Sequence, residues 1–132
     1  MFAKSTSCTN HAQSLLLQSD NQLVKQQAEV DLALSYLQYE SGDTELAIST
    51  LEVSLGRIPR DSQPELYVRS TALLGGLLNV SGRHFESLAM LEELLKTTLP
   101  ESLANRVEFA RTNYASTLEE LGRVEEASKA YH

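Results

Sequence analysis

The chain has 132 residues and seven excess negative charges, because 18 Asp and Glu stand against 11 Lys and Arg. This length suits one ordinary domain and excludes large two-domain enzymes, while 42% hydrophobic and 22% charged residues exclude a disordered polyelectrolyte. The basic residues are scattered, which disfavours nucleic acid, and no apolar window approaches the length of a membrane span. The single Cys8 cannot form an internal disulfide. We therefore expect a soluble, cytoplasmic protein with no nucleic-acid or membrane partner, and the scarcity of Gly and Pro favours an all-α fold.

A first helical segment is predicted by Leu23, Val30, Leu34 and Leu37, which lie three, four or seven residues apart and so form one stripe on a helix. Gly42 ends this helix, because glycine adopts the left-handed conformation of a helix C-terminus without a Cβ penalty. The chain then reverses, and a shorter apolar stripe predicts a second helix antiparallel to the first. The shorter stripe comprises Ala47, Leu51 and Leu55.

The next long helix carries its own start signal. Ser62 and Glu65 have the spacing of a capping box, in which the Ser accepts a hydrogen bond from the first turn and the Glu reaches back. Pro64 is tolerated there because the first helical N–H groups have no intrahelical partner. We therefore expect this helix to start near Asp61.

The pattern repeats along the chain with a period of 40 residues, the spacing of the turn glycines Gly42, Gly82 and Gly122. A small residue lies seven positions before each glycine and another lies five positions after it, so paired helices can approach closely. The small residues are Ser35, Gly75 and Ala115 before the glycines, and Ala47, Ser87 and Ala127 after them. The predicted repeats span residues 20–59, 60–99 and 100–132, the last of them truncated.

The repeat register also predicts whether each end of the array is covered by a capping helix. Shifted back by one period, the register makes residues 1–19 an N-terminal segment whose residues 10–18, with the apolar Leu15–Leu17, form a capping helix over the first pair. At the other end the last helix reaches His132 with no polar helix behind it, although solenoids normally cap their terminal repeats. Two explanations stand: the chain is a piece of a longer repeat protein, or it forms a homo-oligomer through the uncapped C-terminal repeat.

These repeats resemble the tetratricopeptide repeat (TPR) family, whose pattern is a large residue, a small residue, a turn glycine, Ala, a bulky residue and Pro. The matching residues are Leu34-Ser35, Gly42, Ala47, Leu51 and Pro59; Leu74-Gly75, Gly82, Ser87, Leu91 and Pro100; and Tyr114-Ala115, Gly122, Ala127 and Tyr131. The resemblance covers the chain from about residue 20 onward, with a period of 40 instead of about 34. It implies a TPR-like α-α superhelix, a right-handed solenoid of antiparallel helix pairs.

The resemblance also implies a function, that of a non-catalytic scaffold that binds a partner peptide or domain on the concave face of the solenoid. The partner-binding residues that it implies are Glu29, Leu32, Tyr36 and Tyr39 in the first repeat, Arg69, Ala72 and Asn79 in the second, and Phe109, Thr112 and Glu119 in the third. Two of these assignments have alternatives. Tyr36 and Tyr39 share a helix face and either form a binding surface or pack between helices. Arg69 pairs either with a ligand carboxylate or with a nearby glutamate, Glu29 or Glu65.

Charge suggests the chemistry of the partner. The acidic residues assigned to the concave face, Glu29, Glu40, Glu119 and Glu120, outnumber the single base Arg69. By electrostatic complementarity we expect a ligand that is rich in basic and apolar residues.

The long period is also similar to that of kinesin light chains and of the sensor domains of some large bacterial transcription activators. The alternative function is therefore a regulatory or sensor segment of a larger transcription or signalling protein. An enzyme is not expected, because Cys8 and His11, three residues apart, lack a third group to orient them. No metal-ligand cluster or phosphate-binding loop is present in the sequence, so we expect no metal and no cofactor.

Overall fold

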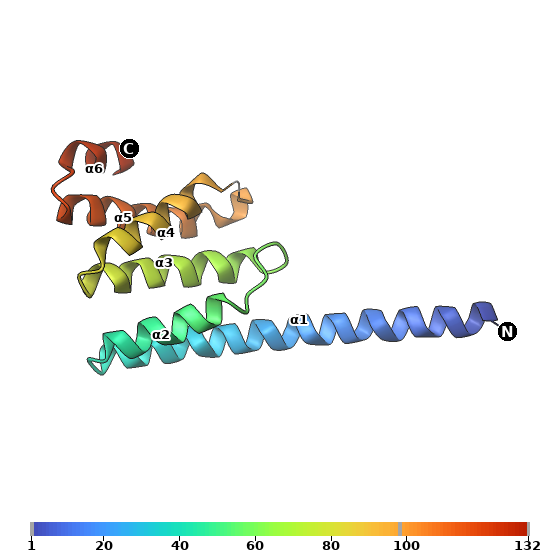
Figure 1. Ribbon diagram of the computed structural model, residues 1–132. Helices are drawn as coiled ribbons and strands as arrows, with labels where there is room; N and C mark the ends of the chain where they lie inside the picture. Colours follow the sequence, from blue (N-terminus) through green and yellow to red (C-terminus); the bar gives the residue numbers. More distant parts are fainter. Residues whose placement is uncertain (1, 98, 132) are drawn as a thin grey trace.

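A computed structural model describes residues 2–97 and 99–131, with the side chains of residues 12–16, 18–97, 99–123 and 125–130. The described residues form six α-helices and one short 3-10 helix and include no strand, so the all-α class is confirmed. The elements are α1 (Phe2–Glu40), α2 (Thr44–Leu55), α3 (Pro64–Val80), α4 (His84–Lys96), η1 (Glu101–Leu103), α5 (Ala104–Glu120) and α6 (Val124–Tyr131). The long N-terminal helix lies at one end of the stack and α6 lies at the other (Figure 1).

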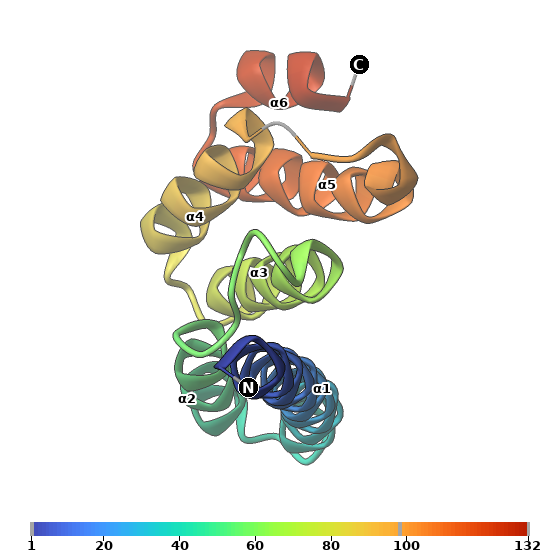
Figure 2. The ribbon, with the colours of Figure 1, turned by 90° about the vertical axis from the view of Figure 1, so that its right-hand side faces the viewer.

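The helices form three pairs, α1 with α2, α3 with α4 and α5 with α6, and each pair packs on the next. Figure 2 shows α1, α3 and α5 stacked one above another, with α2 and α4 beside them. Gly42, Gly82 and Gly122 join the two helices of each pair with φ values of 90°, 87° and 76°. In each turn the amide after the glycine donates to the carbonyl five residues back, as Asp43 does to Gln38 at 2.9 Å. The predicted glycine helix ends are therefore confirmed.

Small residues bring the paired helices together, as the repeat pattern predicts. A Cβ built on Gly75 would lie 2.7 Å from Cδ2 of Leu91, a fully buried side chain of α4. The Ser87 hydroxyl donates to the Gly75 carbonyl at 2.7 Å, a contact that requires the two backbones to be close. The equivalent residues Ser35 and Ala115 are also fully buried.

The N-terminal capping helix predicted for residues 10–18 is not formed. Residues 2–40 are one continuous helix, and the N-terminal half of α1 extends away from the stack (Figure 1). The physical reason is local: no Gly or Pro occurs between residues 2 and 40, so nothing stops the helix. Leu15 and Leu16 are exposed, and the side chain of Leu17 lies outside the described residues.

The apolar stripe predicted on the first helix is turned away from the core. Its members Leu23, Val30, Leu34 and Leu37 are all exposed. The face of α1 that meets α2 and α3 instead carries residues that are mostly small or polar. These buried residues are Ala28, Asp31, Leu32 and Ser35. Small side chains on this face allow the close helix approach, and the larger apolar side chains remain outside.

The start of α3 also differs from the prediction. It begins at Pro64 instead of near Asp61, its N-cap residue is Gln63, and among the described residues no side-chain hydrogen bond caps its first turn, so the capping box of Ser62 is not formed. A residue that precedes proline is disfavoured in the α conformation, because the pyrrolidine ring clashes with its backbone. Gln63 accordingly has φ −131° and ψ 59°, and the helix cannot begin before Pro64.

Candidate functional site

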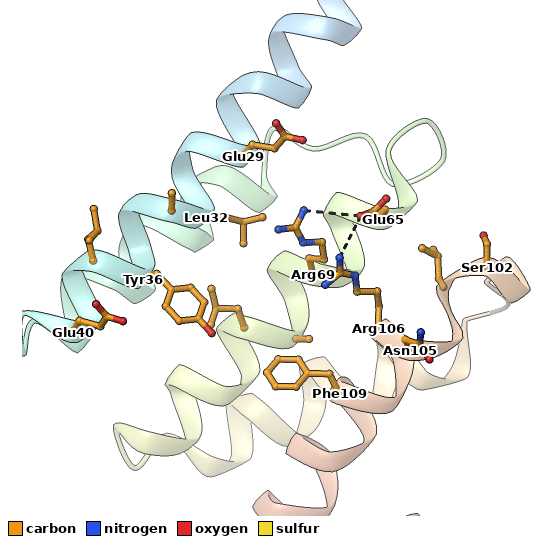
Figure 3. A pocket seen from close by; sticks show the side chains of 15 residues that line it. Glu29, Leu32, Tyr36, Glu40, Glu65, Arg69, Ser102, Asn105, Arg106 and Phe109 are labelled. Carbon is orange, nitrogen blue, oxygen red and sulfur yellow. Dashed lines mark ion pairs between the residues drawn. The ribbon is translucent and has the colours of Figure 1, made fainter.

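An open groove of about 1170 Å³ lies along α1, α3 and the start of α5. Figure 3 shows side chains from these three helices converging on it. The predicted partner-binding residues Glu29, Leu32, Tyr36, Arg69, Ala72 and Phe109 all line it. The three-helix wall follows from the repeat, because the first helix of each pair stacks on its counterpart in the next pair.

Two aromatic side chains dominate the apolar surface of the groove. Tyr36 of α1 is 53% exposed and Phe109 of α5 is 50% exposed, and both reach into the groove (Figure 3). Leu32 and Ala72 form part of its floor and are buried. Since Tyr36 is exposed, the alternative that it packs between helices does not hold. The groove therefore offers rigid aromatic surface above a closely packed base.

Three predicted residues lie outside the groove, and they share one position in the repeat. Tyr39, Asn79 and Glu119 each lie three residues before a turn glycine, and none of them lines the groove. A step of three residues from Tyr36 turns a side chain about 60° around the helix, which takes it off the groove face. Asn79 instead bonds through its side-chain oxygen to the ring of His84.

Thr112 is also outside the groove. Its hydroxyl donates to the carbonyl of Glu108, one turn earlier in α5, at 3.0 Å. The groove meets α5 only over its first turns, from Ser102 in η1 to Phe109, so a residue farther along α5 does not reach it.

Arginine and glutamate form a small network at one side of the groove. Oε1 of Glu65 lies 4.0 Å from Nη1 of Arg69 and 3.6 Å from Nη2 of Arg106 (Figure 3). Of the alternatives for Arg69, the pairing with Glu65 is the one found, and not that with Glu29. Glu65, Arg69 and Arg106 are all partly exposed, so these pairs are worth little stability and leave the arginines accessible to a ligand.

The charge balance of the groove is less acidic than predicted. Glu119 and Glu120 do not line it, and Arg106 adds a second base. Three glutamates therefore face two arginines along the groove. The described residues include no ion pair to Glu29 or Glu40, so these two carboxylates remain available on the α1 side.

Sequence reasoning missed Glu65 and Arg106 as groove residues. Glu65 lies one helical turn before Arg69, and Arg106 lies three residues before Phe109, so each shares a helix face with a predicted residue. Extending each predicted stripe by one turn toward the N-terminus of its helix would have included both.

Comparison of this chain with protein-family models, with curated proteins and with solved structures finds no match.

Among the described residues, no Cys or His lines the groove. The side chains of Cys8 and His11, and residue His132, lie outside the described residues. Within the described part of the chain no three His, Cys, Asp or Glu side chains gather closely enough to hold a metal ion. None of the described helices combines the length and apolar character needed to cross a bilayer.

Proposed function

We propose that this protein is a TPR-like scaffold that binds a peptide or a partner domain in the groove along α1, α3 and α5, without catalysing a reaction. The observation that carries the proposal is the exposure of Tyr36 and Phe109 across that groove. Exposed aromatic residues above a packed floor are typical of the few residues that dominate protein-binding energy. The 40-residue register and the three glycine-ended helix pairs support the assignment to a TPR-like, right-handed superhelix.

The shape of the groove favours a polypeptide over a small ligand. It is open and about 1170 Å³ in volume, whereas small-molecule sites are concave pockets of roughly 300–1,000 Å³ that enclose most of the ligand. A chain segment can extend along the three helices and place a side chain between the two aromatic rings. The groove therefore suits the proposed scaffold better than a metabolite sensor.

The charged residues that border the groove indicate the kind of peptide that it would bind. Glu29 and Glu40 border the groove on α1 without an ion pair among the described residues. Basic side chains of a ligand would meet these carboxylates, while its apolar side chain contacts Tyr36 and Phe109. We infer a segment with an apolar anchor flanked by basic residues.

Peptide selection tests the proposal without a known partner. A random peptide library displayed on phage is selected on the intact chain, and the enriched peptides are measured against Tyr36→Ala and Phe109→Ala. Each substitution should weaken binding about tenfold or more, the loss expected of a hot-spot residue. Phe85→Ala is the matched control, because Phe85 is a 75% exposed aromatic residue of α4 that does not line the groove.

The opposite pattern would contradict the proposed site. Peptides that bind both groove variants as tightly as the unchanged chain, but lose affinity for Phe85→Ala, would place binding elsewhere. The charge inference has a separate readout: selected peptides should lose affinity when their basic residues are replaced by glutamate, and more strongly at low salt. If the peptides with basic residues and those with glutamate in their place bound equally well, the charge inference would be refuted.

A further inference from the structure

A column of large apolar side chains runs along the outside of α1. We define this outer column as Leu16, Leu23, Val30 and Leu37, which are seven residues apart and 59% to 64% exposed. Leu34, 43% exposed, lies beside it. At about 100° per residue the column lies about 140° around α1 from its buried residues. Its last member, Leu37, also lines the groove. Four exposed apolar side chains in one line require an explanation that scattered surface leucines do not.

Comparison with the other repeats shows what these positions contact elsewhere in the array. One period further along, the positions of Val30 and Leu37 are occupied by Ser70 and Leu77, and both are buried. The third repeat has Ala110 and Thr117 there, and both are fully buried. These positions face the preceding helix pair, since α3 packs on α1 and α2, and α5 packs on α3 and α4. The outer column therefore occupies the surface by which a helix of this array contacts another helix, and among the described residues nothing covers it.

The seven-residue spacing specifies a helical partner. A strict seven-residue apolar repeat keeps one line of side chains facing a neighbouring helix when two helices wrap around each other. The 22 residues from Leu16 to Leu37 extend over about 32 Å of helix, so a paired helix would contact the column through about six turns.

The charge distribution permits a second copy of the chain as that partner. The whole chain carries seven excess negative charges, so two copies repel each other over most of their surface. The residues that flank the column on the same side of α1 are Ser19, Gln26, Gln27 and Ala33, none of them charged, and Asp20 lies at the edge. Two copies can therefore meet at this face with little repulsion.

The column is complementary to itself when two helices run antiparallel. Residues whose numbers add up to 53 then lie level with each other about one two-fold axis. The resulting level pairs are Leu16 with Leu37, Leu23 with Val30, Ser19 with Leu34, and Gln26 with Gln27. Apolar residues thus meet apolar residues, and a large side chain meets a small one.

Among the described residues, the C-terminal helix offers no comparable apolar surface. Ser128 of α6 is exposed, whereas its repeat equivalents Ile48 and Leu88 are buried. Head-to-tail stacking of α6 on the α1 of another copy would lack this apolar contact. We propose that two copies of the chain pair through the outer column of α1, antiparallel and with two-fold symmetry, and not through the C-terminal repeat.

The molar mass of the full chain tests the pairing. Sedimentation equilibrium from about 1 to 200 µM should give twice the monomer mass of 14.6 kDa at the upper concentrations. Leu23→Glu combined with Val30→Glu should give the monomer mass throughout, because four carboxylates would then meet at the axis. Val53→Glu combined with Phe85→Glu changes two exposed apolar residues off the column, 56% and 75% exposed, and should leave the dimer intact. Circular dichroism of each variant verifies that the helices remain.

Two results would overturn the proposal. One is a monomer at the highest concentration, which would leave the column to a different helical partner. The other is a dimer that persists in folded Leu23→Glu, Val30→Glu.

Cysteine cross-linking tests the antiparallel order in a Cys8→Ser background. Gln26→Cys should form an intermolecular disulfide, because it lies next to the axis. Ser19→Cys alone should not, because two copies of residue 19 would be about 22 Å apart, beyond the reach of a disulfide. Ser19→Cys mixed with Leu34→Cys should cross-link. A disulfide formed by Ser19→Cys alone would show a parallel pair and overturn the proposed order.

Discussion

Replacing Gly75 by alanine tests the close packing that holds each helix pair together. The new Cβ would lie 2.7 Å from Cδ2 and 2.8 Å from Cγ of Leu91, well inside van der Waals contact. Overpacking of a buried site costs about 1–3 kcal/mol, while removing a glycine from a helix interior gains about 1 kcal/mol. The expected net effect is a loss of about 1 kcal/mol in the free energy of unfolding.

The sign of this effect should depend on Leu91. Leu91→Ala alone should cost about 2–5 kcal/mol, because the side chain is fully buried in the α3–α4 contact. In that background the new Cβ has room, so Gly75→Ala should stabilise the protein by about 1 kcal/mol. Urea unfolding followed by circular dichroism gives the four free energies of the cycle.

A neighbouring glycine provides the control. A Cβ on Gly76 would face the Asn113 side chain at 3.2 Å and not Leu91, so Leu91→Ala should leave the effect of Gly76→Ala unchanged. If Gly75→Ala stabilised the protein equally with and without the Leu91 side chain, the close approach of α3 and α4 would not constrain this position.

Three further predictions concern single residues. Asp43→Ala should lower stability by about 0.5–2 kcal/mol, measured by urea unfolding, because the Asp43 carboxylate caps α2 by accepting from a backbone amide at 3.1 Å; an unchanged stability would refute this role. Thr71→Val should raise stability by about 1 kcal/mol, since the buried Thr71 hydroxyl has no hydrogen-bond partner among the described residues, and a loss would indicate an unrecognised partner. Hydrogen bonds from Arg83 lower the pKa of Glu86 below its ordinary value of 4.5. The stability from this pair is therefore fully present above pH 4.5 and declines as the pH falls through the lowered pKa. In thermal unfolding, Glu86→Gln should show a smaller decline over that range, and an identical pH profile would contradict the linkage.

The helix ends could be predicted from the sequence because their cause is local. A positive φ at Gly42, Gly82 and Gly122 depends on the missing Cβ and on hydrogen bonds within one turn. The continuity of α1 also has a local cause, because no Gly or Pro lies between residues 2 and 40. The prediction of a separate helix over residues 10–18 was wrong because it extended the repeat register into a segment that contains no residue able to end a helix. Helix ends are thus better predicted from turn residues than from an extrapolated period.

Burial was harder to predict because it depends on which neighbours surround a helix. Val30 and Leu37 have the spacing of a core stripe, yet α1 is the terminal helix of the stack and they are exposed. The groove was predicted where positions carry over directly between repeats, as at Glu29, Arg69 and Phe109, which are 40 residues apart. The prediction was wrong at Thr112, because the groove reaches only the first turns of α5, and the extent of a groove is a tertiary property.

The unbroken α1 has a mechanical consequence. About 30 Å of helix separate Leu16 from Tyr36, with no glycine or proline between them at which the helix could bend. The projecting half of α1 and one wall of the groove therefore move as a single rigid rod. Any surface that fixes the tilt of the projecting half also fixes the angle at which Tyr36 faces the groove, so the two ends of the helix cannot be positioned independently.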